Sequence, residues 1–167
     1  MDPDHGRSGA SETTRHFVAT VYVVNDGATA LHHHDKLEMW LPPGGHVERD
    51  ELPHVAAERE VREELGMPVD LVAPAGDFDT GTVRSLPRPQ HVLLEDIDVY
   101  GDGSVGHQHV DFVFYGRVPG QEIDPGAGEQ AAEDWAWLDP GDLAARSDLE
   151  ADVTAIGREA IRTVASD

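Results

Sequence analysis

Strand-like and helix-like patterns of apolar residues follow one another along the chain, beginning with a strand pattern. The run HFVATVYVVN at 16–25 is rich in β-branched and aromatic residues, and ATALHHH follows after Asn25-Asp26-Gly27. Asparagine, aspartate and glycine between two such runs favour the backbone conformations of a tight turn. We therefore predict a β-hairpin in this part of the chain.

The spacing of apolar residues becomes helical in the next segment. LPPGG at 41–45 interrupts the strand pattern, and the alanine- and glutamate-rich stretch 51–65 then has helical periodicity. Gly66 follows it and is suited to end a helix. A strand, a glycine loop and a helix are thus expected in that order.

The remaining strand patterns are separated by loops that contain proline and glycine. Strands are expected at 70–79, inside a long loop at 80–106, at 108–118 and at 131–138. Strands interleaved with two main helices predict the α/β class. The expected architecture is an α/β/α sandwich, in which a mixed β-sheet is covered on both sides.

Two sequence signals near the C-terminus predict helices. Asp139-Pro140 predicts a brief helical turn, and Ser147 with Glu150 has the spacing of a capping box. A set of apolar residues then falls on one face of a terminal helix: Val153, Ile156, Ala160, Ile161 and Val164.

The composition limits both the architecture and the chemistry. With 167 residues, 39% of them hydrophobic, the chain can form the core of one domain and has no room for a second large one. The absence of cysteine excludes disulfides, thiolate metal sites and cysteine nucleophiles. Residues 1–14 are polar, so we expect a disordered N-terminal tail there and a single domain over 15–167.

The charge balance is strongly acidic. The chain has 33 acidic and 12 basic residues, a formal net charge of -21, and Lys36 is its only lysine. Scattered arginines do not form the basic stripe that binds nucleic acid, and no apolar stretch reaches the length of a membrane span. We therefore expect a cytoplasmic protein. The even acidic coat favours a salt-rich, halophilic cytosol over an ordinary acidic protein.

Carboxylates gather on the apolar face of the predicted helix. Leu52, Ala56, Ala57, Val61 and Leu65 form one apolar arc, and helical rotation places Glu60, Glu63 and Glu64 within its span. A glutamate-rich helix usually has a solvated charged face. Here inward carboxylates would repel one another and lose hydration unless a cation or protons compensate them. Oxygen ligands favour Mg²⁺ or Mn²⁺, ions that also bind substrate phosphates.

Nine positions match the pattern G-x5-E-x7-R-E-U-x-E-E-x-G-U, where U is an apolar residue. They are Gly45, Glu51, Arg59, Glu60, Val61, Glu63, Glu64, Gly66 and Met67. This is a complete Nudix box, so the chain resembles the Nudix hydrolase family over residues 45–67. The resemblance implies the Nudix fold and hydrolysis of a nucleoside diphosphate linked to another moiety.

The resemblance also implies roles for individual residues. Glu60, Glu63 and Glu64 would be metal ligands or, for one of them, the base, and the Gly45 carbonyl would be a further ligand. Arg59 and Glu51 would form a salt bridge that holds the loop against the helix. Many members use an additional acid outside the box, and Glu129 is the best-placed candidate, in competition with Glu133, Glu95 and Asp111. Either Glu63 or Glu129 would accept the proton of the attacking water.

Two groups of histidines lie outside the box. His107, His109 and Asp111 share one face of a predicted strand and are candidates for a substrate-binding wall, although a solvent-facing strand surface fits the same alternation. Among His32, His33 and His34, only the first and last share a face, which disfavours a metal cluster.

These observations predict a metal-dependent pyrophosphohydrolase that acts on a nucleotide, nucleotide-sugar or nucleoside triphosphate-like substrate. The alternative is a non-catalytic nucleotide-sensing Nudix domain, but such domains typically lose box glutamates. An isoprenoid diphosphate isomerase on this fold is excluded because it needs a catalytic cysteine. The expected partner is a small nucleotide-like molecule, with neither nucleic acid nor membrane, and a homodimer is left open.

Overall fold

The computed structural model describes residues 12–167. Strand β1 (Thr14–Asn25) and strand β2 (Ala28–His34) form the predicted hairpin. Asp26 and Gly27 turn the chain with positive φ angles of 48° and 73°, conformations in which aspartate and glycine are tolerated. Most of the predicted tail lies outside the described residues. Its last residue, Thr14, already belongs to β1.

Eight strands form one mixed sheet. After β1 and β2 come β3 (Met39–Leu41), β4 (Gly44–His46), β5 (Asp70–Leu71), β6 (His91–Val99), β7 (Val105–Arg117) and β8 (Trp135–Leu138). The main path is β3-β2-β1-β7-β5, with β4 beside β1, β6 beside β7 and β8 beside β2. The long β1–β7 pair is parallel, whereas the other pairs are antiparallel.

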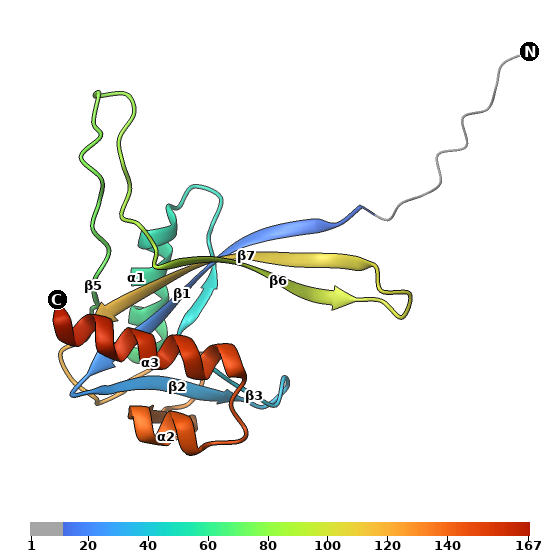
Figure 1. Ribbon diagram of the computed structural model, residues 1–167, viewed down its shortest axis with the longest axis vertical. Helices are drawn as coiled ribbons and strands as arrows, with labels where there is room; N and C mark the ends of the chain where they lie inside the picture. Colours follow the sequence, from blue (N-terminus) through green and yellow to red (C-terminus); the bar gives the residue numbers. More distant parts are fainter. Residues whose placement is uncertain (1–11) are drawn as a thin grey trace, which may run out of the picture.

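Helices cover the two faces of this sheet (Figure 1). Helix α1 (Pro53–Leu65) packs its buried residues against Val21, Val23 and Phe114. Helix α3 (Ala151–Ser166), preceded by α2 (Pro140–Ala145), packs against the opposite face. Because alternate residues of a strand point to opposite faces, β1 and β7 contribute to both cores. The predicted α/β/α sandwich is confirmed.

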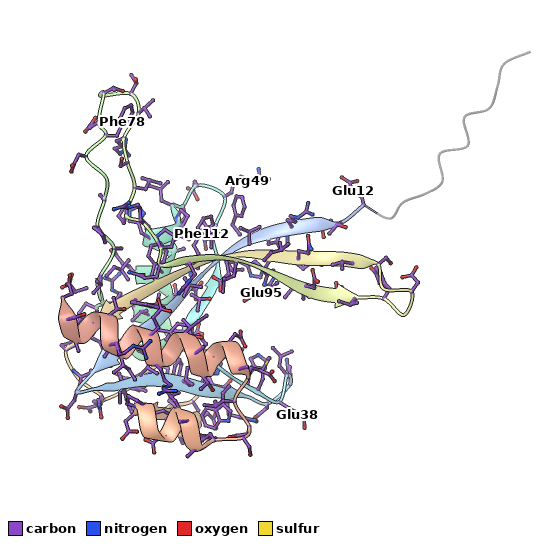
Figure 2. All side chains as sticks on the ribbon, viewed as in Figure 1. Glu12, Glu38, Arg49, Phe78, Glu95 and Phe112 are labelled. Carbon is purple, nitrogen blue, oxygen red and sulfur yellow. The ribbon has the colours of Figure 1, made fainter. Side chains whose placement is uncertain are left out.

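Three local predictions are wrong. The strand predicted at 70–79 is only β5, because the chain from 74 to 90 forms a protruding loop with two isolated β-bridges, whose tip carries Phe78 (Figure 2). The glycine loop contains β4, which pairs with β1. The capping box before α3 is absent, since Glu150 is the N-cap and its side chain makes no capping bond.

A capping box does occur before α2. The Asp139 side chain accepts hydrogen bonds from the backbone of Gly141 and Asp142, and the Asp142 side chain accepts one from the Asp139 backbone. Aspartate at both positions satisfies backbone groups that a helix start leaves free. This confirms the brief helical turn predicted from Asp139-Pro140.

Strands β1, β6 and β7 continue past the helices as an extended arm (Figure 1). The apolar side chains Phe17, Val92 and Leu94 are exposed there. Within residues 12–167, no helix combines the length and apolar character needed to span a membrane.

Candidate active site

Helix α1 is held between two glycines that cannot be replaced without a collision. Gly66 ends the helix with a φ of 71°, and a side chain at this position would collide with the backbone carbonyl of Asp124. A side chain at Gly45, on β4, would collide with the carboxylate of Glu60. The box glycines therefore allow β4 and the 124–129 loop to approach the C-terminal half of the carboxylate helix.

Glu64 is the most buried acid of the box. Its residue is 6% exposed, and its Oε1 accepts a 2.8 Å hydrogen bond from the backbone N–H of Gly44. Burial raises the pKa of Glu64 to about 8; the bond from Gly44 opposes this rise, and the negative charge of Glu60 adds to it. The hydrogen bond from Gly44 only partly offsets the burial, and a bound cation would further stabilise the charged carboxylate.

Glu60 lies half-buried beside Gly45, one helical turn before Glu64. Burial raises its pKa, while the hydrogen bond from Arg59 acts in the opposite direction. The prediction that all three acids face inward is wrong for Glu63, whose side chain is 47% exposed. Helical rotation puts Glu63 at the edge of the arc beside Leu52, and Leu52 is itself exposed.

Arg59 connects the box loop to the helix. Its Nε and Nη2 donate to the two carboxylate oxygens of Glu51 at 2.9 and 3.0 Å, and Nη2 also donates to the His46 carbonyl at 3.0 Å. Nη1 donates to Glu60 at 2.7 Å and to Glu63 at 3.1 Å. This bidentate geometry is the strong form of an arginine–carboxylate pair. The salt bridge expected between Arg59 and Glu51 is present.

Glu129 is brought to the cluster by the loop that follows β7. The N–H of Asp124 donates to the Leu65 carbonyl at 3.1 Å, and the N–H of Gly126 donates to the Glu63 carbonyl at 2.7 Å. The charge of Glu129 contributes to the raised pKa values of both Glu60 and Glu64. The expected additional acid thus lies close to the box carboxylates.

His32 is a neighbour of this cluster that the sequence did not reveal. Its Nε2 lies 3.9 Å from Glu64 Oε2, and its ring packs 4.7 Å from that of Trp135. Burial, followed by the proximity of His34, lowers the pKa of His32 to about 4, so its imidazole is neutral at neutral pH. Strand alternation showed which histidines share a face, but gave no sign that this face meets Glu64.

The predicted substrate wall lies on the other face of the sheet. His107 and His109 do share a face of β7, with ring centroids 5.2 Å apart. Asp111 follows on that face, where it is 3% exposed and burial raises its pKa to about 7. Its neighbour Phe112 packs against the core beneath α1. These three residues are therefore separated by the sheet from Glu60 and Glu64. Their role in substrate binding stays a prediction.

A cavity of about 560 Å³ adjoins the box loop. Its walls include two arginines, Arg15 and Arg49, and two aromatic residues, Phe17 and Phe112, together with Glu51 of the box. Figure 2 shows Arg49 on the loop between β4 and α1. The cavity shares Glu51 with the Arg59 salt bridge, and His16 and His46 also line it.

Comparisons with known proteins agree with this geometry. The family profile described as NUDIX domain matches residues 14–162. The crystal structure of a NUDIX-family hydrolase from Clostridium perfringens is 32% identical, with a TM-score of 0.77, and the match covers 90% of this chain and 99% of that chain. The chain belongs to the Nudix hydrolase family, and it is an enzyme of the class that acts on diphosphate bonds.

More distant structures share the fold. The MutT protein from Methanosarcina mazei Go1 is 17% identical, with a TM-score of 0.58 and coverage of 92% of this chain and 97% of that chain. The dihydroneopterin triphosphate pyrophosphohydrolase of E. coli is 19% identical, with a TM-score of 0.55 and coverage of 89% and 92%. A comparison with curated protein sequences gave no match.

Proposed function

We propose that this Nudix hydrolase is a divalent-metal-dependent pyrophosphohydrolase that cleaves a nucleoside diphosphate linked to another moiety. One observation carries the proposal: Glu60 and Glu64 are held together, largely away from water, against the backbone of Gly44 and Gly45. The charges of these two desolvated carboxylates repel each other, and the charge of Glu60 adds to the raised pKa of Glu64. A divalent cation bound by the carboxylates of Glu60 and Glu64 would offset this repulsion and would also bind the substrate.

The donors fit a hard divalent cation. Glu60, Glu63 and Glu64 supply carboxylate oxygens, Gly45 supplies a backbone carbonyl, and Glu129 adds a further acid beside them. Oxygen-only donors suit Mg²⁺ or Mn²⁺, which retain positions for phosphate oxygens and water. When bound, the ion would neutralise the diphosphate and lower the pKa of a water molecule.

Residues of the chain itself would position the reactants and move the proton. Arg59 fixes the loop that carries Gly45 by binding Glu51 and the His46 carbonyl. The carboxylate of Glu63 is engaged by Arg59 at 3.1 Å, and this ion pair competes with proton acceptance. We therefore assign the general base to Glu129, which reaches the same cluster from a different loop.

The cavity beside the box loop is our candidate for the part of the substrate that is not hydrolysed. Arg15 and Arg49 offer positive charge in an otherwise acidic protein, and Phe17 and Phe112 offer flat apolar surfaces. Such a combination suits an anionic group joined to a planar ring.

The experiment is a panel of nucleoside triphosphates, nucleotide sugars and dinucleoside polyphosphates, each assayed with Mg²⁺, with Mn²⁺ and with a chelator. Chromatography of the products should show cleavage within the diphosphate of at least one substrate, and chelation should stop it. Cleavage that persists in the chelator would contradict the metal requirement. Binding of nucleotides without any turnover would favour a sensing domain instead.

A further inference from the structure

Four imidazole rings meet on the face of the sheet opposite the glutamates. His16 lies on β1, His46 on β4, and His107 and His109 on β7. Neighbouring ring centroids are 5.2 Å apart for His16 and His46, 5.2 Å for His46 and His109, 5.2 Å for His109 and His107, and 4.6 Å for His107 and His16. The four rings thus form a closed quartet.

The strand register explains why residues so distant in sequence meet. In the parallel pair of β1 and β7, His16 lies opposite His109, and in the antiparallel pair of β1 and β4, Val18 lies opposite His46. Paired residues point to the same face, and residues two apart on one strand do so as well. The three strands therefore deliver their histidines to one point at the base of the extended arm.

Three of these histidines have the spacing of metal ligands. One ring nitrogen from each of His16, His46 and His109 lies within 4.8 Å of the other two. A tetrahedral Zn²⁺ with bonds of 2.0–2.1 Å needs nitrogens about 3.3 Å apart. Because His16 and His46 are exposed and His109 is half-buried, small rotations of the side chains can close the remaining distance.

We propose that His16, His46 and His109 form a second metal site, which binds a borderline transition-metal ion, with Zn²⁺ as the ion to test first. Imidazole nitrogens suit Zn²⁺, whereas the oxygen donors of α1 suit Mg²⁺ or Mn²⁺. The two sites therefore differ in the ions they select. This inference does not rest on the proposed hydrolysis reaction.

The surroundings of the quartet are those of a metal-binding site. Glu95 Oε2 lies 3.8 Å from Nδ1 of His109, which brings a carboxylate to the ring, as is usual behind metal-bound histidines. Figure 2 shows Glu95 on this part of the sheet. Thr14 Oγ1 and His107 Nδ1 are 2.8 Å apart, so a hydroxyl orients the fourth ring. Thr14 thus orients the ring of His107, and the Glu95 carboxylate lies near the ring of His109.

An ion at this site would link β1, β4 and β7 where the arm leaves the sandwich. β4 also carries Gly45, and the carbonyl of His46 accepts a hydrogen bond from Arg59. Gly45 and His46 are consecutive residues of β4 and therefore face opposite sides of the sheet. Gly45 faces the glutamates, and the imidazole of His46 faces the other histidines. The ion should stabilise this strand against thermal unfolding, independently of any ion bound to the glutamates.

The test uses the full chain with any affinity tag removed, because a histidine tag would bind the same metals. Zn²⁺ is titrated by calorimetry in excess Mg²⁺, which occupies the oxygen-rich site. His16→Ala and His109→Ala should each weaken Zn²⁺ binding by at least about 10- to 100-fold, since that much is lost when an outer partner of a ligand is removed. His33→Ala, on β2 and outside the quartet, is the matched control and should bind as the wild type does.

Two further measurements keep the result unambiguous. Glu60→Gln should leave Zn²⁺ binding at the histidines unchanged, and X-ray absorption at the zinc edge should show imidazole scattering. Circular dichroism in a chelator shows whether each variant is folded, and His46→Asn serves as a third variant if another unfolds. Three results would overturn the proposal and indicate that the histidines bind no ion. They are no Zn²⁺ binding by the wild type, an equal loss of Zn²⁺ affinity in His33→Ala, and a loss of Zn²⁺ affinity in Glu60→Gln but not in the histidine variants.

Discussion

The carboxylate cluster of α1 and the histidine quartet lie on opposite faces of β4, and they are built in different ways. The carboxylates come from α1, the loop before it and the loop after β7, they range from buried Glu64 to exposed Glu63, and Arg59 pairs with three of them. The histidines come from three strands, and two of the three candidate ligands are exposed. A sequence motif within one segment defines the carboxylate cluster, whereas the pairing of three strands defines the histidine quartet. We propose that the carboxylate cluster carries the hydrolytic step.

Removing a box carboxylate should have the largest effect. Glu64→Gln or Glu60→Gln should reduce kcat by at least about 100-fold, because each removes a carboxylate that we propose as a metal ligand while keeping the shape of the side chain. Steady-state kinetics with Mg²⁺ tests this. Glu58→Gln, on the same helix but at a variable position of the box, is the control and should retain activity. Wild-type rates in either box variant would disprove the assignment of the metal site.

Glu129→Gln should reduce kcat by at least about 10-fold if Glu129 is the base, because general bases usually contribute 10²–10⁴-fold. Its substrate affinity should change little. Glu133→Gln, a close neighbour in sequence, and Glu95→Gln, beside the histidine quartet, are the controls. A larger loss in either control than in Glu129→Gln would show that another acid acts as the base.

The salt bridge of the box loop should make a smaller contribution, which depends on pH. The hydrogen bonds from Arg59 lower the pKa of Glu51, against the opposing effect of burial. A lowered pKa means that the pair stabilises the fold above the normal glutamate pKa and that this stabilisation is lost as the pH falls through the folded-state value. Glu51→Gln should therefore cost about 1 kcal/mol near neutral pH.

Urea unfolding of wild type and Glu51→Gln in a chelator measures this difference. It should be present at about pH 7, shrink as the pH falls below the normal glutamate pKa, and vanish once the Glu51 carboxyl is protonated in the folded state as well. The loss of stability is moderate because Arg59 keeps Glu60 and Glu63 as partners. A difference that grows toward acidic pH would reverse the sign of the expected linkage.

Added salt should have the smallest effect on stability. This effect should come from the dispersed surface acids and not from the buried cluster. The screening length falls from about 10 Å at 0.1 M to about 3 Å at 1 M ionic strength, so repulsion among the 33 acids is damped in concentrated salt. Tm should rise from about 0.1 M to 2 M KCl by more than in sucrose, and by the same amount in wild type and Glu64→Gln. Equal effects of KCl and sucrose would argue against a halophilic protein.

Local spacing in the sequence was sufficient to predict the helix, its glycine end and the identity of the box. Two runs of strand-forming residues around a turn signal predicted the hairpin. Alternation placed His107 and His109 on one face of β7, because a strand fixes side-chain direction with a period of two. Composition excluded cysteine chemistry. These predictions depend on residues a few positions apart, whose geometry follows from the backbone alone.

Only the tertiary structure decided which of these residues meet. Helical rotation alone placed Glu63 with its neighbours, whereas the packing of α1 left it exposed and in contact with Arg59. Strand register brought His16 and His46 to His109, and the position of the 124–129 loop brought Glu129 to Glu64. Such contacts join segments separated by tens of residues, and no short-range pattern encodes them. They depend on how the strands pair and how the helix packs on the sheet.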